Sequence, residues 1–185
     1  MRPPPDLATV FTAQEAFRDS FSTLILATVS DECRPEASYA PYVRDTDGRL
    51  YVYVSELSRH TANLKHQPRA SVLFIESEQD SKHLFARQRL TYECHTREVE
   101  RDSERWQYIL TQFETKFGKF MELLRNLKDF HLFEIRPQRG IYVAGFAQAY
   151  EITGERLDSI RHLNDTGHRA ADTATDQAMQ RVTRQ

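Results

Sequence analysis

The chain has 185 residues, of which 39% are hydrophobic, 28% charged and 11% aromatic, with a formal net charge of -2. This length and composition predict one packed domain over residues 1–185. The near-zero charge gives no overall attraction to nucleic acid or an anionic membrane, and no run is long and apolar enough for a membrane span. The N-terminus lacks a signal-peptide core, so we expect a cytoplasmic protein in which Cys33 and Cys94 stay reduced thiols.

The first half of the chain combines short β-forming runs with turn residues. Residues 12–20 predict a short helix. Runs rich in β-branched and aromatic residues, bounded by Asp, Gly, Ser and Pro, predict strands. These strands cover residues 21–30, 36–44, 49–55 and 70–77. Between the last two, "SRHTANLKH" predicts a helix over 58–66, capped by Ser58 and ended by Pro68.

A long alternating stretch over residues 86–99 predicts a fifth strand. Leu90, Tyr92 and Cys94 point to one side, and polar residues that include Arg89 point to the other. The length of this strand exceeds what a small barrel needs. Its polar face is therefore expected to meet either a second subunit or solvent.

Residues 106–124 are predicted to be helical, because apolar residues from Trp106 to Leu124 recur at spacings of three, four and seven. Gly118 is expected to divide this segment into two helices, with Trp106 in the core. Two strands, 130–137 and 140–152, follow. A helical turn is expected near 155–162.

Short strands joined mostly by tight turns predict an antiparallel barrel and not a doubly wound parallel sheet. The fold class is therefore mainly β with helices, α+β. The barrel is expected over approximately residues 20–152. A tail over 153–185 follows, in which "NDTGHRAADTATDQ" is poor in apolar residues.

This stretch, residues 164–177, contains a single histidine, His168, which follows a glycine. From the residues alone it is either a solvated side chain or a ligand on a movable arm, because a neutral imidazole is a common metal ligand. The other histidines show no metal-ligand spacing, and no P-loop, HExxH or nucleophile-elbow motif is present.

Several segments, in this order, together resemble the haem-utilisation proteins of the HugZ/HutZ type, a branch of the pyridoxamine-phosphate-oxidase-like, FMN-binding split-barrel superfamily. The similarity covers roughly residues 20–170. The segments are "LATVSDECRPEASYAPYV", "SELSRHTANLKHQPRASVLFIE", "LFARQRLTYE", "VERDSERW", "KDFHLFEIRPQRGIYVAGFAQAYEI" and "GHR".

The resemblance implies a homodimeric split β-barrel that binds haem between subunits and degrades it to release iron, with an external electron donor. By motif position, His168 of "GHR" is the axial ligand of the haem iron. Asp129, at the start of the "DFHLF" strand, lies near that ligand and tunes it, and Arg89 of "RLT" lies in the haem pocket. From the residues alone, Asp129 equally suits a turn, and Arg89 a solvated or interfacial ion pair.

The same resemblance suggests FMN as a less favoured cofactor. In flavin-binding relatives the segment that matches "SELSRHT" holds the FMN phosphate together with basic residues of the preceding strand. Arg44, Ser58 and Arg59 stand at such positions, whereas Tyr39 replaces an arginine and His60 a lysine. Two missing cations weaken a phosphate site, although these residues also suit haem propionates or a capped helix.

The sequence thus leaves three functions open. The first is an oxidative haem-degrading enzyme, the second a non-catalytic haem carrier, and the third an FMN-dependent oxidoreductase. Pyridoxamine-phosphate oxidation itself is not expected, because the basic C-terminal motif of those enzymes is absent.

Overall fold

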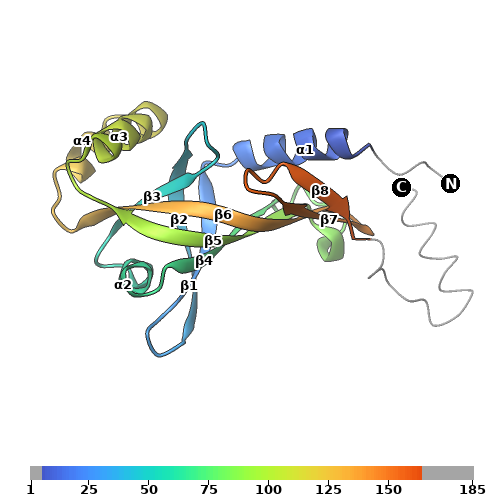
Figure 1. Cartoon of the computed structure of the whole chain (residues 1–185), viewed down its shortest axis with the longest axis horizontal. Helices are drawn as coiled ribbons and strands as arrows, with labels where there is room; N and C mark the ends of the chain where they lie inside the picture. Colours follow the sequence, from blue (N-terminus) through green and yellow to red (C-terminus); the bar gives the residue numbers. More distant parts are fainter. Residues whose placement is uncertain (1–5, 164–185) are drawn as a thin grey trace, which may run out of the picture.

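The computed structural model describes residues 6–163, which form eight strands, four α-helices and one short 3-10 helix (Figure 1). The strands are β1 (Thr23–Val29), β2 (Pro35–Arg44), β3 (Leu50–Ser55), β4 (Arg69–Ile75), β5 (Arg89–Val99), β6 (Phe130–Gly145), β7 (Gln148–Thr153) and β8 (Ser159–His162). The helices are α1 (Leu7–Asp19), α2 (Arg59–His66), α3 (Glu104–Phe117), α4 (Phe120–Arg125) and the 3-10 helix η1 (Leu84–Ala86).

The strands form one antiparallel sheet in the order β3-β2-β1-β4-β5-β6-β7-β8, and β3 also pairs with β6. This second pairing closes the first six strands into a barrel, while β7 and β8 continue the sheet beyond it (Figure 1). The prediction of an antiparallel α+β barrel is confirmed. None of the helices among residues 6–163 is long and apolar enough to cross a membrane.

Three predicted elements need correction. The separate strands 130–137 and 140–152 are wrong, because β6 runs unbroken from Phe130 to Gly145. A β-bulge lies opposite Glu93 and Cys94, and Gln138 is its extra, unpaired residue. Because of this bulge, β6 continues to pair with β5 through the Pro and Gly of "RPQRG" without forming a turn. The helical turn near 155–162 is also wrong, since β8 pairs with β7 beyond the predicted end of the barrel.

The first helix begins earlier than predicted, at Leu7, because the Asp6 side chain accepts hydrogen bonds from the amides of Ala8 and Thr9. Ser58 does stand at the start of α2, but its side chain makes no capping hydrogen bond. The break at Gly118 is confirmed, and there the backbone adopts a φ of 78° that favours glycine.

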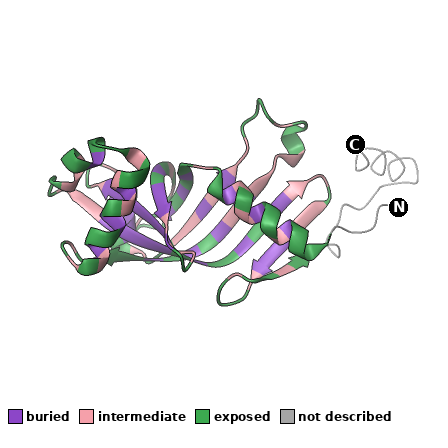
Figure 2. Cartoon of the chain, turned by 90° about the horizontal axis from the view of Figure 1, so that it is seen from above, coloured by how far each residue is buried: buried purple, intermediate pink, exposed green. Residues whose placement is uncertain are grey.

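Two apolar cores hold the domain together. Figure 2 shows buried residues along the strands and on the helices. The first core fills the barrel, where Val10 of α1 and Leu64 of α2 reach it. The second lies between the outer face of the barrel and α3, where Trp106 is buried as predicted. Cys33 is exposed and Cys94 buried, and both are free thiols. Burial raises the pKa of Cys94, which keeps that thiol protonated.

Candidate functional site

The first group of candidate residues lies where β3 passes into α2. His60 is only 7% exposed, and its Nδ1 lies 3.0 Å from Ser38 Oγ on β2. Burial lowers the pKa of His60, although the nearby Glu36 acts in the opposite direction. Its Nε2 is buried and makes no hydrogen bond within residues 6–163. The imidazole is therefore neutral near pH 7 and keeps one nitrogen available.

Ser38, and not Tyr39, is thus the β2 residue that faces α2. Tyr39 points to the opposite side of the strand and is 69% exposed. Arg59 is exposed, and Ser58 is half-buried. Arg59 makes no side-chain hydrogen bond or ion pair in the part of the chain that the structure describes.

Asp129 is fixed against the same junction. Its carbonyl accepts a hydrogen bond of 2.8 Å from the Glu56 amide, and its Oδ2 accepts one of 2.9 Å from Ser55 Oγ. The Thr61 hydroxyl in turn donates to the Ser55 carbonyl. The structure therefore brings Asp129 next to the segment that carries Ser58 and His60. Asp129 Oδ1 makes no hydrogen bond within the described residues, so it remains able to accept one.

An ionic cluster that the sequence reasoning missed lies beside Asp129. His131 Nε2 is 2.7 Å from Glu56 and its Nδ1 is 2.5 Å from Glu98. Lys65 Nζ also contacts Glu56, at 2.8 Å. Hydrogen bonds from Lys65 and His131 lower the pKa of Glu56. These residues come from β5, β6, α2 and the turn after β3, so only the three-dimensional fold reveals the cluster.

Arg89 begins β5, on the outer face of the barrel. It pairs with Ile75 on β4 and Val143 on β6, and its guanidinium contacts only the Arg87 carbonyl among the described residues. Ten residues of β5 separate Arg89 from Val99, whose partner Leu132 lies close to Asp129. At the usual rise per residue this is roughly 30 Å. One chain therefore does not bring Arg89 and Asp129 together.

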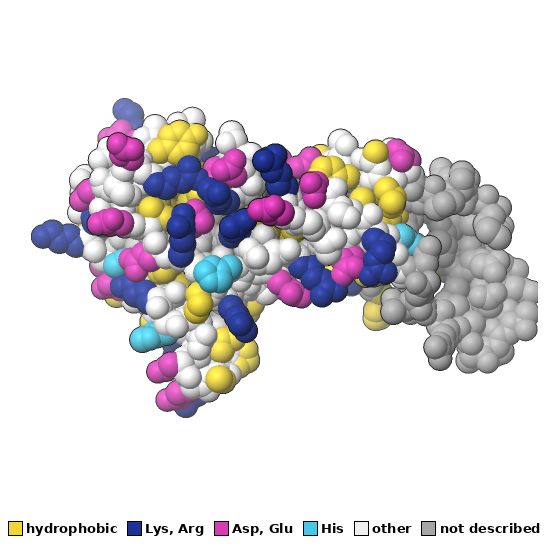
Figure 3. Space-filling view, in the orientation of Figure 1, with side chains coloured by type: hydrophobic (Ala, Val, Ile, Leu, Met, Phe, Trp, Pro, Cys, Tyr) yellow, Lys and Arg dark blue, Asp and Glu magenta, His cyan; other side chains and the backbone are white. Residues whose placement is uncertain are grey.

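The outer face beside Arg89 carries a row of residues that we call the outer apolar row. The strand register places four apolar residues and one threonine side by side across five strands: Tyr39, Ile25, Leu73, Thr91 and Ile141. Ile25 is 38% and Ile141 41% exposed. Figure 3 shows hydrophobic side chains at the surface of the part formed by β1 and β2. Apolar residues that gather on an exposed face often mark a site of interaction.

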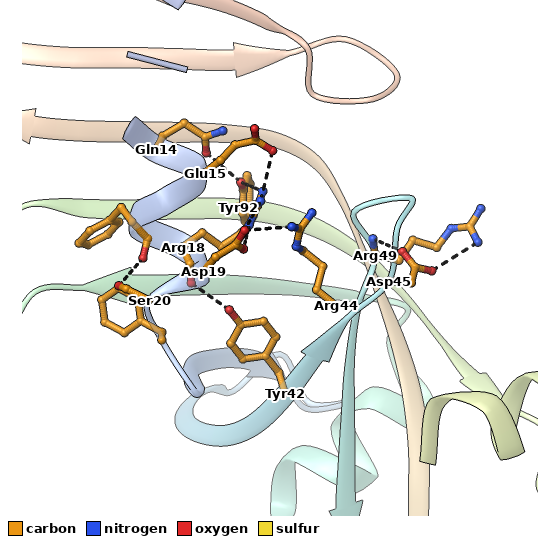
Figure 4. Close-up of polar contacts among 12 residues, drawn as sticks. Gln14, Glu15, Arg18, Asp19, Ser20, Tyr42, Arg44, Asp45, Arg49 and Tyr92 are labelled. Atoms are coloured by element: carbon orange, nitrogen blue, oxygen red, sulfur yellow. Dashed lines mark hydrogen bonds and ion pairs between the residues drawn. The ribbon is translucent and has the colours of Figure 1, made fainter. Parts of the chain in front are cut away.

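Arg44 lies at the other end of β2 from Ser38, about 20 Å away at the usual rise per residue. Its guanidinium donates to Asp19 of α1 at 2.9 Å (Figure 4). Asp19 also pairs with Arg18, which is buried. The prediction that Arg44 acts with Ser58 and Arg59 in one anion site is therefore not met within one chain. His168 lies outside the described residues.

Comparison with known proteins agrees with the fold and with the motif set. The family model described as pyridoxamine 5'-phosphate oxidase matches residues 11–144. Over 153 residues, which span 83% of this chain and 86% of the relative, the chain is 43% identical to the heme oxygenase HutZ of Vibrio cholerae serotype O1. The chain belongs to the HutZ-type branch of the pyridoxamine 5'-phosphate oxidase family.

Solved structures place this HutZ-type chain in the same group. HutZ of Vibrio cholerae, whose crystal structure is described as that of a heme storage protein, is 41% identical with a TM-score of 0.65, over 69% of this chain and 89% of the other. ChuZ of Campylobacter jejuni is 29% identical with a TM-score of 0.81, over 92% of this chain and 69% of the other. A heme binding protein from Mycobacterium smegmatis, at 24% identity and a TM-score of 0.67, shares the fold.

Proposed function

We propose that this HutZ-type chain binds haem as its substrate and degrades it oxidatively to release iron. The observation that carries the proposal is the 43% identity to a heme oxygenase over most of both chains. The reaction needs O₂ and an external electron donor, which we expect to be a separate molecule of the cytoplasm. A carrier that binds and hands on haem is the second candidate, because the HutZ crystal structure is described as that of a storage protein.

The outer face of the barrel offers surroundings that suit a porphyrin. Haem is a flat apolar ring that carries two propionates and an iron. The outer apolar row supplies apolar contacts, and Arg89 beside it has guanidinium donors left after its bond to the Arg87 carbonyl. A guanidinium is well shaped to pair with a propionate. These residues therefore fit the ring and one of its charged groups.

The separation of Arg89 from Asp129 supports a homodimer. If both residues act on one haem, they must come from different subunits, because within one chain they lie at opposite ends of β5 and β6. A two-fold axis across the outer face can place the Arg89 end of one chain beside the Asp129 end of its partner. The exposed outer apolar row is the surface that such a dimer would cover.

His168 is proposed as the axial ligand, and Asp129 as the residue that tunes it. A single protein imidazole leaves the opposite face of haem open to O₂. The free Asp129 Oδ1 can accept an imidazole N–H, which makes the ring a stronger electron donor. Ser55 and the Glu56 amide hold Asp129 in place for this role.

FMN binding finds less support in the same residues. The neutral, buried His60 adds no positive charge beside Ser58 and Arg59, and Tyr39 turns away from α2. Arg44 lies at the other end of β2. A yellow protein on purification, with a flavin spectrum, would reverse this preference.

A haemin titration tests the binding part. We expect the wild type to give a sharp Soret band with near-stoichiometric binding, and His168→Ala to lose it. His66→Ala is the matched control, because His66 is exposed on α2 and outside the proposed site. Equal binding by the wild type and His168→Ala would contradict the axial role of His168.

A turnover assay tests the enzymatic part. With ascorbate as the electron donor and O₂ present, the Soret band should decay while released iron is captured by a ferrous chelator. Asp129→Asn should bind haem but turn it over at least tenfold more slowly. A stable wild-type haem complex under these conditions, and with an enzymatic reductase system, would instead identify a carrier.

The dimer is tested by light scattering after size-exclusion chromatography. Tyr39→Asp combined with Ile141→Asp places charges in the outer apolar row and should give monomers with impaired haem binding. Phe120→Asp is the control, since Phe120 is equally exposed but lies on α4. A monomeric wild type, or a double variant that stays dimeric, would refute this interface.

A further inference from the structure

A cavity of about 460 Å³ lies at the α1 end of the barrel, away from Asp129 and the outer apolar row. It is bounded by α1, by the turn between β2 and β3, by the bulged part of β6 and by the turn between β7 and β8. Its volume falls within the range of pockets that hold small organic molecules. Of the described residues considered above for haem or FMN, only Arg44 lines it.

Five arginines line this cavity, against three carboxylates. The arginines are Arg18, Arg44, Arg49, Arg136 and Arg156. They come from four segments of the chain, because Arg44 and Arg49 share the β2–β3 hairpin, and their convergence is a property of the fold and not of a local basic run. Asp19 and Asp45, just outside the lining, pair with Arg18, Arg44 and Arg49, so the arginines left without an acidic partner among the described residues are Arg136 and Arg156. Guanidinium groups bind phosphate and carboxylate through paired hydrogen bonds.

The inner arginines are held in position by the protein itself. Arg18 is only 6% exposed, and Asp19, Glu15 and the hydroxyl of Tyr92 receive its hydrogen bonds. Arg44 shares Asp19 with it, as Figure 4 shows. A buried cation with this many partners is rigid. The Arg18 guanidinium therefore forms the inner wall of the cavity.

The outer arginines are different, because they lack partners. Arg136 and Arg156 are exposed, and neither makes an ion pair or a side-chain hydrogen bond within residues 6–163. Both lie on the cavity lining beside Arg49. All their N–H donors remain available to an incoming anion.

The rest of the lining includes an apolar part, formed by Phe11, Pro137 and Leu157. A bare inorganic ion would leave these side chains uncovered, whereas a carbon skeleton would pack against them. We propose that the cavity binds a small organic oxyanion that bears either a phosphate ester or a pair of carboxylates. None of the described residues proposed to contact haem lines this cavity, so the proposal does not depend on haem binding.

Calorimetric titration of the full-length protein tests this with three matched aromatic probes. Phenyl phosphate and phthalate share a ring but differ in the anionic group, and benzyl alcohol lacks the charge. We expect saturable binding of at least one anion, one per chain, and none of benzyl alcohol. The stronger of the two anions identifies the phosphate or the carboxylate class.

The decisive variant is Arg136→Gln combined with Arg156→Gln. Both side chains are exposed and unpaired among the described residues, so the fold and thermal midpoint should be retained. Binding of the preferred anion should weaken at least tenfold. Arg34→Gln, in the turn between β1 and β2, is the control and should leave affinity unchanged.

Three results would overturn the proposal. These are the absence of saturable binding of either anion, equal binding by the double variant and the wild type, and equal weakening in Arg34→Gln. The last would show only a general attraction of anions to surface arginines. Because none of these measurements uses haem, failure here leaves the haem proposal intact.

Discussion

Replacing Gly140 by alanine should destabilise the domain. Gly140 lies on β6 just after the bulge, and a Cβ at this position would stand 2.8 Å from Cδ1 and Cε1 of Tyr92 and 3.3 Å from the Thr91 carbonyl. The Tyr92 ring cannot easily retreat. It is buried against Phe74, and its hydroxyl bonds to Gln14 and Arg18 of α1.

The expected cost follows from two opposing effects. Forcing an extra methyl group into a filled core costs about 1–3 kcal/mol. Against this, alanine restricts the unfolded chain more than glycine does, which returns roughly 0.5–1 kcal/mol in a strand. The difference between these ranges is about 0–2.5 kcal/mol, and its midpoint gives an expected net loss of about 1 kcal/mol. For a domain of this size that corresponds to a fall in Tm of roughly 2–4 °C.

Urea and thermal unfolding of Gly140→Ala and Gly145→Ala measure this difference. Gly145 is also on β6, but nothing lies within 4 Å of its Cβ position, so its substitution should be neutral or slightly stabilising. In a Tyr92→Leu background the penalty of Gly140→Ala should largely disappear, since the flat ring that blocks the methyl is gone. Gly140→Ala as stable as the wild type would refute the assumption that the ring is rigidly held.

Three further outcomes are expected. Burial lowers the pKa of the His60 imidazole from 6.5, so folding favours its neutral form. The contribution of His60 to the free energy of unfolding is therefore complete above pH 6.5 and is lost as the pH falls through its pKa in the folded state. His60→Gln should reduce the change of the urea midpoint between pH 7.5 and 5. Ile109→Ala leaves a cavity under α3 and should cost about 2–5 kcal/mol, measured by urea unfolding. Asn63→Ala removes the buried hydrogen bond of 2.9 Å from Asn63 Nδ2 to Thr28 Oγ1 and should lower the free energy of unfolding by about 1–3 kcal/mol. The more conservative Asn63→Asp also lacks the N–H donor and will show whether loss of that donor is the cause.

Local sequence signals predicted most of the barrel, because its strands are dense in β-branched and aromatic residues between turn residues. These local signals gave wrong predictions where pairing within the sheet determines the backbone conformation. The Pro and Gly near Pro137 and Gly140 look like a chain break, but the bulge accommodates the first and the Tyr92 ring requires the second. The β8 strand is short and polar, so only its pairing with β7 identifies it.

The site was less predictable, because it depends on distance along strands and on register. Asp129 lies next to the junction that carries Ser58 and His60, a proximity that the sequence did not predict. Arg44 does not join them, because it lies at the other end of β2. The partners of His131 come from neighbouring elements, which no spacing in the sequence reveals.

The same geometry explains why the proposed haem site needs two chains while the anion cavity needs only one. Arg89 and Asp129 lie at opposite ends of a long strand pair, so in the proposed haem site a second copy would supply one of them. The five cavity arginines instead line a single cavity, because α1, the bulged part of β6 and the two turns all contribute to its lining. Loss of the dimer should therefore abolish haem binding and leave phenyl phosphate or phthalate binding unchanged. If Tyr39→Asp with Ile141→Asp weakened both, the two sites would be coupled and their assignment to separate faces would be wrong.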